Sequence, residues 1–163
     1  MPDMLAFCKW IEQTSVGSAI RESLWLFPAI ETAHLLGMAM LVATITLFDL
    51  RLLDWMKRPE RVSELGRRLL PWSWIGFTVQ VITGALLFSS EAVKVYGNPA
   101  FRLKMLLILV AGVQVLIFHL GFYRKAASWH ERSSLPIAVK VAGGLSILLW
   151  VGVVTAGRFI GFV

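Results

Sequence analysis

The sequence contains little charge and almost no cysteine. Of its 163 residues only 16% are charged, whereas a soluble domain usually carries about 25%. A single cysteine, Cys8, excludes a disulfide scaffold. The hydrophobic share of 57% excludes intrinsic disorder. Low charge together with high apolar content favours a membrane protein over a soluble domain.

Several familiar catalytic signatures are also missing. The sequence has no Walker loop, no nucleophile elbow, no CxxC pair and no HExxH motif. A zinc site is not expected, because the three histidines are scattered and Cys8 is remote from them. These absences leave open whether the protein is an enzyme.

The basic residues do not indicate nucleic acid. The net charge is +6, with 16 Lys and Arg against 10 Asp and Glu. Many of these cations lie between long apolar runs. In membrane proteins the loops on the cytoplasmic side are rich in Lys and Arg, which accounts for the excess of positive charge. We therefore expect the lipid bilayer, and no nucleic acid, as a partner.

Four apolar stretches are long enough to cross a bilayer, which needs about 20 residues. They predict an all-α fold, an integral membrane four-helix bundle in one domain over residues 1–163. Pro71, Pro99 and Pro136 are expected to precede or open helices. Pro28 lies inside the first run, so that helix either starts there or is kinked there. Whether copies of the chain form a homo-oligomer stays open. The predicted spans are 24–50, 71–90, 101–123 and 136–160.

Lys and Arg counts predict the orientation. Ten of the 16 cations fall in, or within a few residues of, the segments that join the first span to the second and the third span to the fourth. These segments should face the cytoplasm. Both termini would then lie outside, in the periplasm of a Gram-negative host, with the protein in the bacterial inner membrane. The ten are Arg51, Lys57, Arg58, Arg61, Arg67, Arg68, Arg124, Lys125, Arg132 and Lys140.

The first residues predict a short interfacial helix over about 4–14. Phe7, Trp10 and Ile11 share one face of such a helix, and polar residues occupy the others. The alternative is a frayed terminus.

Ionisable residues inside apolar spans are functional candidates, because burying them is costly. His34 leads the set, which also contains Glu31, Lys104, His119 and Arg158. A neutral imidazole can ligate haem iron, and Gly37 one turn later would leave room for a flat ring. The alternative is a structural histidine, hydrogen-bonded across helices to Gln80 or Thr83.

Some of these residues are expected to lie at the same depth in the membrane. At about 1.5 Å per residue, His34 should lie level with Thr83 and Gly84, and near Lys104. Arg102, Lys104 and Arg158 could receive haem propionates. The alternative is that these cations extend to the membrane surface.

A second axial ligand is harder to assign. His119 should lie roughly 12–18 Å deeper than His34, so the two should not share one haem within the chain. His119 then has a structural role or belongs to a second haem. Met105 lies near the level of His34 and is a candidate sixth ligand. An open iron position is equally allowed.

Two further groups have structural interpretations. Asp49 and Arg51 should end the first span and pair with each other or with loop charges. Gly143 and Gly157 belong to small-residue stretches of the fourth span, which favour close helix packing. The alternative is space for a ligand or a second protomer.

Two helices resemble a known group. The run from His34 through Gly37 and Asp49 to Arg51 resembles the first helix of the HemJ-like and CopD-like bacterial membrane proteins. The run from Lys104 to His119 is similar to their third helix, and the whole chain looks like an uncharacterised family of small four-helix membrane proteins. The HemJ group binds haem b and is associated with protoporphyrinogen oxidation, and the CopD group with copper tolerance.

The resemblance implies a haem ligand at His34 and a partner at Lys104. Protoporphyrinogen oxidation is not carried over, because the Lys104-to-His119 spacing is longer than in HemJ and a double histidine is absent. We expect a b-type haem protein in electron transfer, with a quinone or a redox partner protein, or in a haem- or porphyrin-linked redox step. The alternative is a cofactor-free subunit for transport, copper handling or assembly.

Overall fold

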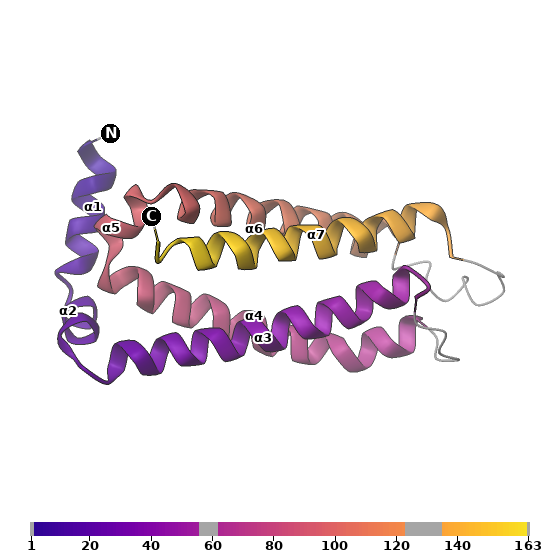
Figure 1. Ribbon diagram of the computed structural model, residues 1–163, viewed down its shortest axis with the longest axis horizontal. Coiled ribbons are helices and arrows are strands. Elements are labelled where there is room, and N and C mark those ends of the chain that lie inside the picture. The colour runs from indigo at the N-terminus through magenta and orange to yellow at the C-terminus, as the bar shows by residue number, and fades with distance from the viewer. Residues whose placement is uncertain (1, 56–61, 123–134, 163) are drawn as a thin grey trace.

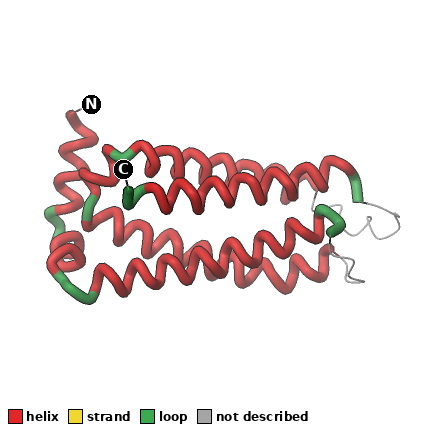
Figure 2. Tube along the Cα trace, viewed as in Figure 1, coloured by secondary structure: helices red, strands yellow, loops and turns green. Residues whose placement is uncertain are grey.

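The computed structural model describes residues 2–55, 62–122 and 135–162. Within these ranges every regular element is a helix (Figures 1 and 2), so the predicted all-α fold is confirmed. The helices are α1 (Pro2–Glu12), α2 (Ser15–Glu22), α3 (Leu26–Leu52), α4 (Val62–Ser90), α5 (Ala92–Gly97), α6 (Pro99–Ile117), the π-helical turn η1 (Phe118–Phe122) and α7 (Ile137–Phe159).

Among the described residues, four helical stretches are long and apolar enough to cross a membrane. They are α3, α4, α6 with its continuation to Gly121, and α7, whose most apolar 18 residues have mean hydropathies of 1.8, 1.3, 2.2 and 2.1. Their side chains face outward along much of their length, as a lipid-facing surface requires. The chain is therefore a multi-pass membrane protein.

The long helices form two hairpins. α3 packs along α4, and α6 packs along α7, while α3 and α7 join the two pairs (Figure 1). The N- and C-termini lie at the same end, beside α1, α2 and α5. We call this the terminal end, and the opposite end, where α3 finishes and α7 begins, the loop end.

α4 begins nine residues earlier than the sequence predicted. Pro71 lies inside α4 and does not open it, so that expectation is wrong. Pro99 does open α6, and Pro136 is the residue before α7. The additional turns form because Val62 and Leu65 are buried at the loop end. This packing outweighs the lost hydrogen bond at Pro71.

Pro28 causes no kink in the middle of a span. It is the third residue of α3, in the first turn, where its missing N–H has no helical acceptor to lose. Ser23 caps this turn, since its hydroxyl accepts from the backbone N–H of Leu26 at 3.1 Å. The first span therefore starts just before Pro28, which is one of the two expected alternatives.

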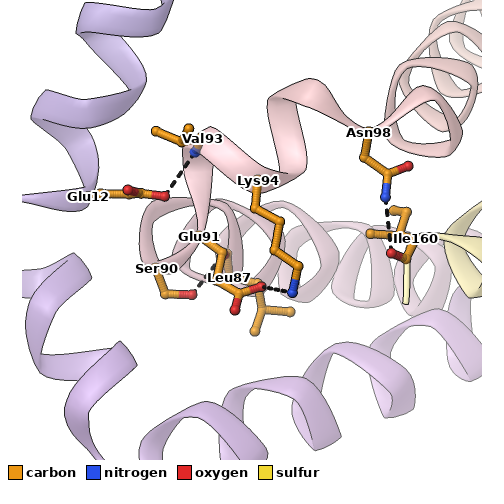
Figure 3. Close-up of polar contacts among 8 residues, drawn as sticks. All are labelled: Glu12, Leu87, Ser90, Glu91, Val93, Lys94, Asn98 and Ile160. Atoms are coloured by element: carbon orange, nitrogen blue, oxygen red, sulfur yellow. Dashed lines mark hydrogen bonds and ion pairs between the residues drawn. The ribbon is translucent and has the colours of Figure 1, made fainter. Parts of the chain in front are cut away.

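The N-terminal residues form two helices, where the sequence predicted one over 4–14. α1 lies across the terminal end of the bundle against α5, and α2 packs on α4 (Figure 1). Cys8, a residue of α1, is only 1% exposed. The Glu12 carboxylate accepts from the backbone N–H of Val93 at 2.9 Å, in the first turn of α5 (Figure 3). α1 is thus attached to the bundle, and the frayed alternative is wrong.

Asn98 joins two helices at the terminal end. Its Oδ1 accepts from the backbone N–H of Ala100 at 2.9 Å and caps α6. Its Nδ2 donates to the carbonyl of Ile160, just after α7, at 3.0 Å (Figure 3). One buried side chain therefore fixes the start of α6 and the end of α7.

The loop end contains a hydrophobic core. Leu52, Val62, Phe118 and Val139 are buried together, one from each of the four spans. The Phe48 ring meets Phe118 edge-on, with centroids 6.3 Å apart. The two hairpins are therefore closed together at this end.

Glycines bring α3 and α4 into close contact. A Cβ at Gly76 would lie 3.0 Å from the carbonyl oxygen of Gly37 and from the backbone nitrogen of Leu41. A Cβ at Gly37 would lie 2.7 Å from a methyl group of Val79. The space at Gly37 is filled by α4, so the expectation that it admits a flat ring is wrong.

Candidate functional site

The imidazole of His34 is oriented by a hydroxyl of the neighbouring helix. Its Nδ1 lies 2.8 Å from Oγ1 of Thr83, and that hydroxyl donates its own proton to the Val79 carbonyl at 2.6 Å. With its proton on the Val79 carbonyl, the Thr83 hydroxyl accepts from His34, and this assignment puts the ring proton on Nδ1. Nε2 then carries a lone pair. The cross-helix hydrogen bond to Thr83, which the structural alternative for His34 predicted, is confirmed.

Two more contacts fix His34 against α4. The side-chain amide of Gln80 donates to the His34 backbone carbonyl. A Cβ at Gly84 would lie 3.3 Å from Cε1 of the imidazole, so the ring fits over a glycine. The predicted level of His34, opposite Thr83 and Gly84, is therefore correct.

Lys104 approaches the same region from the other hairpin. Its ammonium lies within electrostatic range of the His34 imidazole. A Cβ at Gly157 would lie 3.5 Å from Nζ of Lys104 and 3.6 Å from Cδ, so the lysine stem rests where α7 has no side chain. His34 and Lys104, the residues singled out by the resemblance, thus share one level of the bundle, which we call the His34 site.

The two arginines expected beside Lys104 have contacts of their own at the terminal end. Arg102 donates from Nε to the Tyr96 carbonyl at 3.1 Å, and its guanidinium lies 5.2 Å from the centre of the Tyr96 ring. The Arg158 guanidinium lies 5.6 Å from the centre of the Phe162 ring. Both arginines are exposed, as the surface alternative for them requires.

Met105 follows Lys104 in sequence but lies on another face of α6. One residue turns the helix by about 100°, and the Met105 side chain is 49% exposed, whereas Lys104 is partly buried over Gly157. The structure thus brings Lys104, rather than Met105, towards α7.

His119 lies at the loop end. It belongs to η1, directly after Phe118 of the loop-end core. His34 is at the other half of the bundle, so the expected separation of the two histidines is confirmed. Within the ranges that the structure describes, no three side chains of His, Cys, Asp or Glu come together as a metal cluster.

A buried carboxylate at the loop end was not a sequence candidate. Asp49 is only 4% exposed, and Ser146 of α7 hydrogen-bonds to it. Arg51 instead pairs with Asp54 at 3.3 Å, and Asp54 also lies 3.5 Å from Nζ of Lys140. Pairing with a loop charge is correct for Arg51, but the expected pairing is wrong for Asp49, because helix residues two apart do not face each other.

Comparison with curated proteins and with solved structures finds no match. The resemblance to the HemJ-like and CopD-like proteins stays a prediction. One family model matches residues 7–163, almost the whole sequence. The chain therefore belongs to DUF6644, a family of unknown function.

Proposed function

We propose that this protein binds haem b through His34 and serves in membrane electron transfer or in a haem- or porphyrin-linked redox step. The observation that carries the proposal is the hydrogen bond from Nδ1 of His34 to Thr83. It leaves Nε2 with the lone pair that an iron ligand needs. A metal-ligating histidine almost always donates its other ring N–H in this way.

Polar groups around His34 support this proposal, whereas the space at Gly37 is taken by α4 and offers the haem ring no room. Thr83 and Gln80 hold the ring and its backbone on α4. Lys104 supplies a cation at the same level, suited to a propionate carboxylate. Haem bound there would supply a reversible one-electron centre. A quinone in the bilayer or a redox partner protein would exchange electrons with it.

The proposed location is the bacterial inner membrane, with the loop end in the cytoplasm and both termini in the periplasm. Support comes from the excess of Lys and Arg in the two connecting segments. The two termini also share one end of the bundle (Figure 1). A C-terminal alkaline phosphatase fusion should be active, and a cytoplasmic C-terminus would leave it inactive. Some of these cations lie outside the described residues: Lys57, Arg58, Arg61, Arg124, Lys125 and Arg132.

A cofactor-free role is the second candidate. The bond between His34 and Thr83 and the bond from Gln80 to the His34 carbonyl both tie α3 to α4. Hydrogen bonds of this kind hold membrane helices together without any ligand. In that case the chain would act as a transport, copper-handling or assembly subunit.

Absorption spectra decide between the two candidates. The detergent-purified protein, made in cells supplied with a haem precursor, is measured oxidised and after reduction with dithionite. The proposal expects a Soret band with b-type reduced peaks. His34→Ala should lose them, and His119→Ala, at the other end of the bundle, should retain them.

The controls separate ligation from folding. Circular dichroism and gel filtration must show that His34→Ala keeps its helices and its size. A colourless wild type would overturn the haem proposal and leave the cofactor-free role. Loss of the bands in His119→Ala alone would move the ligand to the loop end.

A further inference from the structure

Asp49 is a buried carboxyl group between α3 and α7. Its exposed fraction is 4%, and it lies three residues before the last residue of α3. α7 comes close because Gly143 faces it, where a Cβ would lie 3.1 Å from the Asp49 carbonyl oxygen. The carboxyl group is therefore enclosed by helix packing, although it is only about 5 Å along the axis from the end of its helix.

The carboxyl group is incompletely satisfied. Ser146 is its hydrogen-bonding neighbour, while Oδ2 is buried without a hydrogen-bond partner among the described residues. An ionised carboxylate in such a place is costly, and a proton removes that cost. A protonated Oδ2 would also become a donor.

A second buried acceptor lies on the same stretch of α7. Gln114 of α6 donates from Nε2 to the Ala142 carbonyl at 2.9 Å, one turn before Ser146. Its Oε1 is buried and, in the part of the chain described, also has no hydrogen-bond partner. α3 and α6 thus each bring a buried oxygen acceptor to the segment of α7 from Ala142 to Ser146.

The charged groups nearby are engaged elsewhere or lie at the surface. Arg51 and Lys140 both meet Asp54, within 3.3 and 3.5 Å. On α4, Arg68 lies 3.9 Å from Glu64, on an exposed face. Ser146, a neutral donor, is the residue of α7 that hydrogen-bonds to Asp49. The remaining titratable groups of the described loop end are Arg67, which is exposed, and His119 in η1.

We propose that Asp49 and Ser146 form a proton-binding site that exchanges with the aqueous phase at the loop end. The proton binds a carboxylate oxygen of Asp49 and forms an O–H bond. On release it returns to water at the loop end, and no electron moves. A sodium ion fits this site less well, because sites for hard cations assemble several oxygen ligands, and among the described residues Asp49 belongs to no group of three or more His, Cys, Asp or Glu side chains.

Infrared spectroscopy of the full chain in lipid nanodiscs tests this directly. A protonated carboxyl group has a C=O stretch that shifts in heavy water and disappears on ionisation. We expect such a band at pH values where exposed carboxyl groups are already ionised. Asp49→Asn should abolish it. The matched control Asp54→Asn, an exposed carboxyl at the same end, should leave it unchanged.

Ser146→Ala provides the second variant. Loss of its hydrogen bond should shift the band in frequency without removing it. If Asp49→Asn does not fold, the band is assigned in the wild type by isotope-labelled aspartate and by this shift. A band that vanishes together with the exposed carboxyls overturns the proposal. A band that disappears on adding sodium at constant pH, but not on adding choline, would make it a sodium site instead.

Discussion

The imidazole of His34 and the hydroxyl of Thr83 form a directed hydrogen bond across the α3–α4 interface, with 2.8 Å between Nδ1 and Oγ1. The direction is set by Val79, whose carbonyl receives the Thr83 proton. One backbone acceptor on α4 therefore determines which ring nitrogen of α3 is available to a ligand.

Replacing Thr83 by valine should weaken the bundle modestly. The side chain keeps its shape but loses the acceptor for Nδ1–H. Hydrogen bonds between membrane helices are worth on average about 0.6 kcal/mol, so a loss of that order is expected in reversible unfolding by SDS in mixed micelles. Thr83→Ser keeps the hydroxyl and should recover most of the loss. Equal destabilisation by serine and valine would mean that the methyl group, not the hydrogen bond, matters.

Gly76→Ala should destabilise the protein far more than Gly112→Ala. A Cβ at Gly76 would lie 3.0 Å from backbone atoms of Gly37 and Leu41, which cannot move without separating α3 from α4. Overpacking of this kind costs about 1–3 kcal/mol. Gly112 has no atom within 4 Å of its Cβ position, and alanine favours a helix there. The same unfolding assay compares the two, and a neutral Gly76→Ala would show that this contact is loose.

The membrane spans and the depth of His34 could be predicted, because both follow from the constant rise per residue of an α-helix. Helix length in a bilayer follows from the rise per residue, and the same rise placed His34 opposite Thr83. The start of α4 could not be predicted this way. The charged stretch before Pro71 looks like a loop until Val62 and Leu65 are seen to pack at the loop end.

The sequence also did not predict which face of its helix each side chain occupies. Arg102, Lys104 and Met105 lie at similar depths along α6, but they point in different directions. Arg102 contacts Tyr96, and the Lys104 side chain lies over Gly157. Asp49 was missed for the related reason that its position near the end of α3 suggested exposure. Gly143 on a distant part of the chain is what lets α7 cover it.

Variants of Asn98 should separate its two roles. Asn98→Asp keeps an oxygen that caps α6 but loses the Nδ2 donor to the Ile160 carbonyl. Hydrogen exchange should then accelerate near the end of α7 while the amides of Ala100 and Phe101 stay protected. Asn98→Ala loses both hydrogen bonds, so exchange should accelerate both at the start of α6 and near the end of α7. Loss of a cap costs about 1 kcal/mol, which corresponds to roughly fivefold faster exchange. Unchanged exchange at Ala100 in the alanine variant would contradict the capping role.

The attachment of α1 can be measured through Cys8, the single cysteine of the sequence. Its side chain is 1% exposed, so a maleimide should react only when α1 opens locally. Glu12→Ala removes the acceptor of the Val93 N–H, and a loss of about 1 kcal/mol should raise the labelling rate roughly fivefold. Lys94→Ala is the matched control, because it breaks the exposed pair with Glu91 without touching α1 (Figure 3). Fast labelling of the wild type, or equal rates in both variants, would mean that Glu12 does not hold α1 against α5.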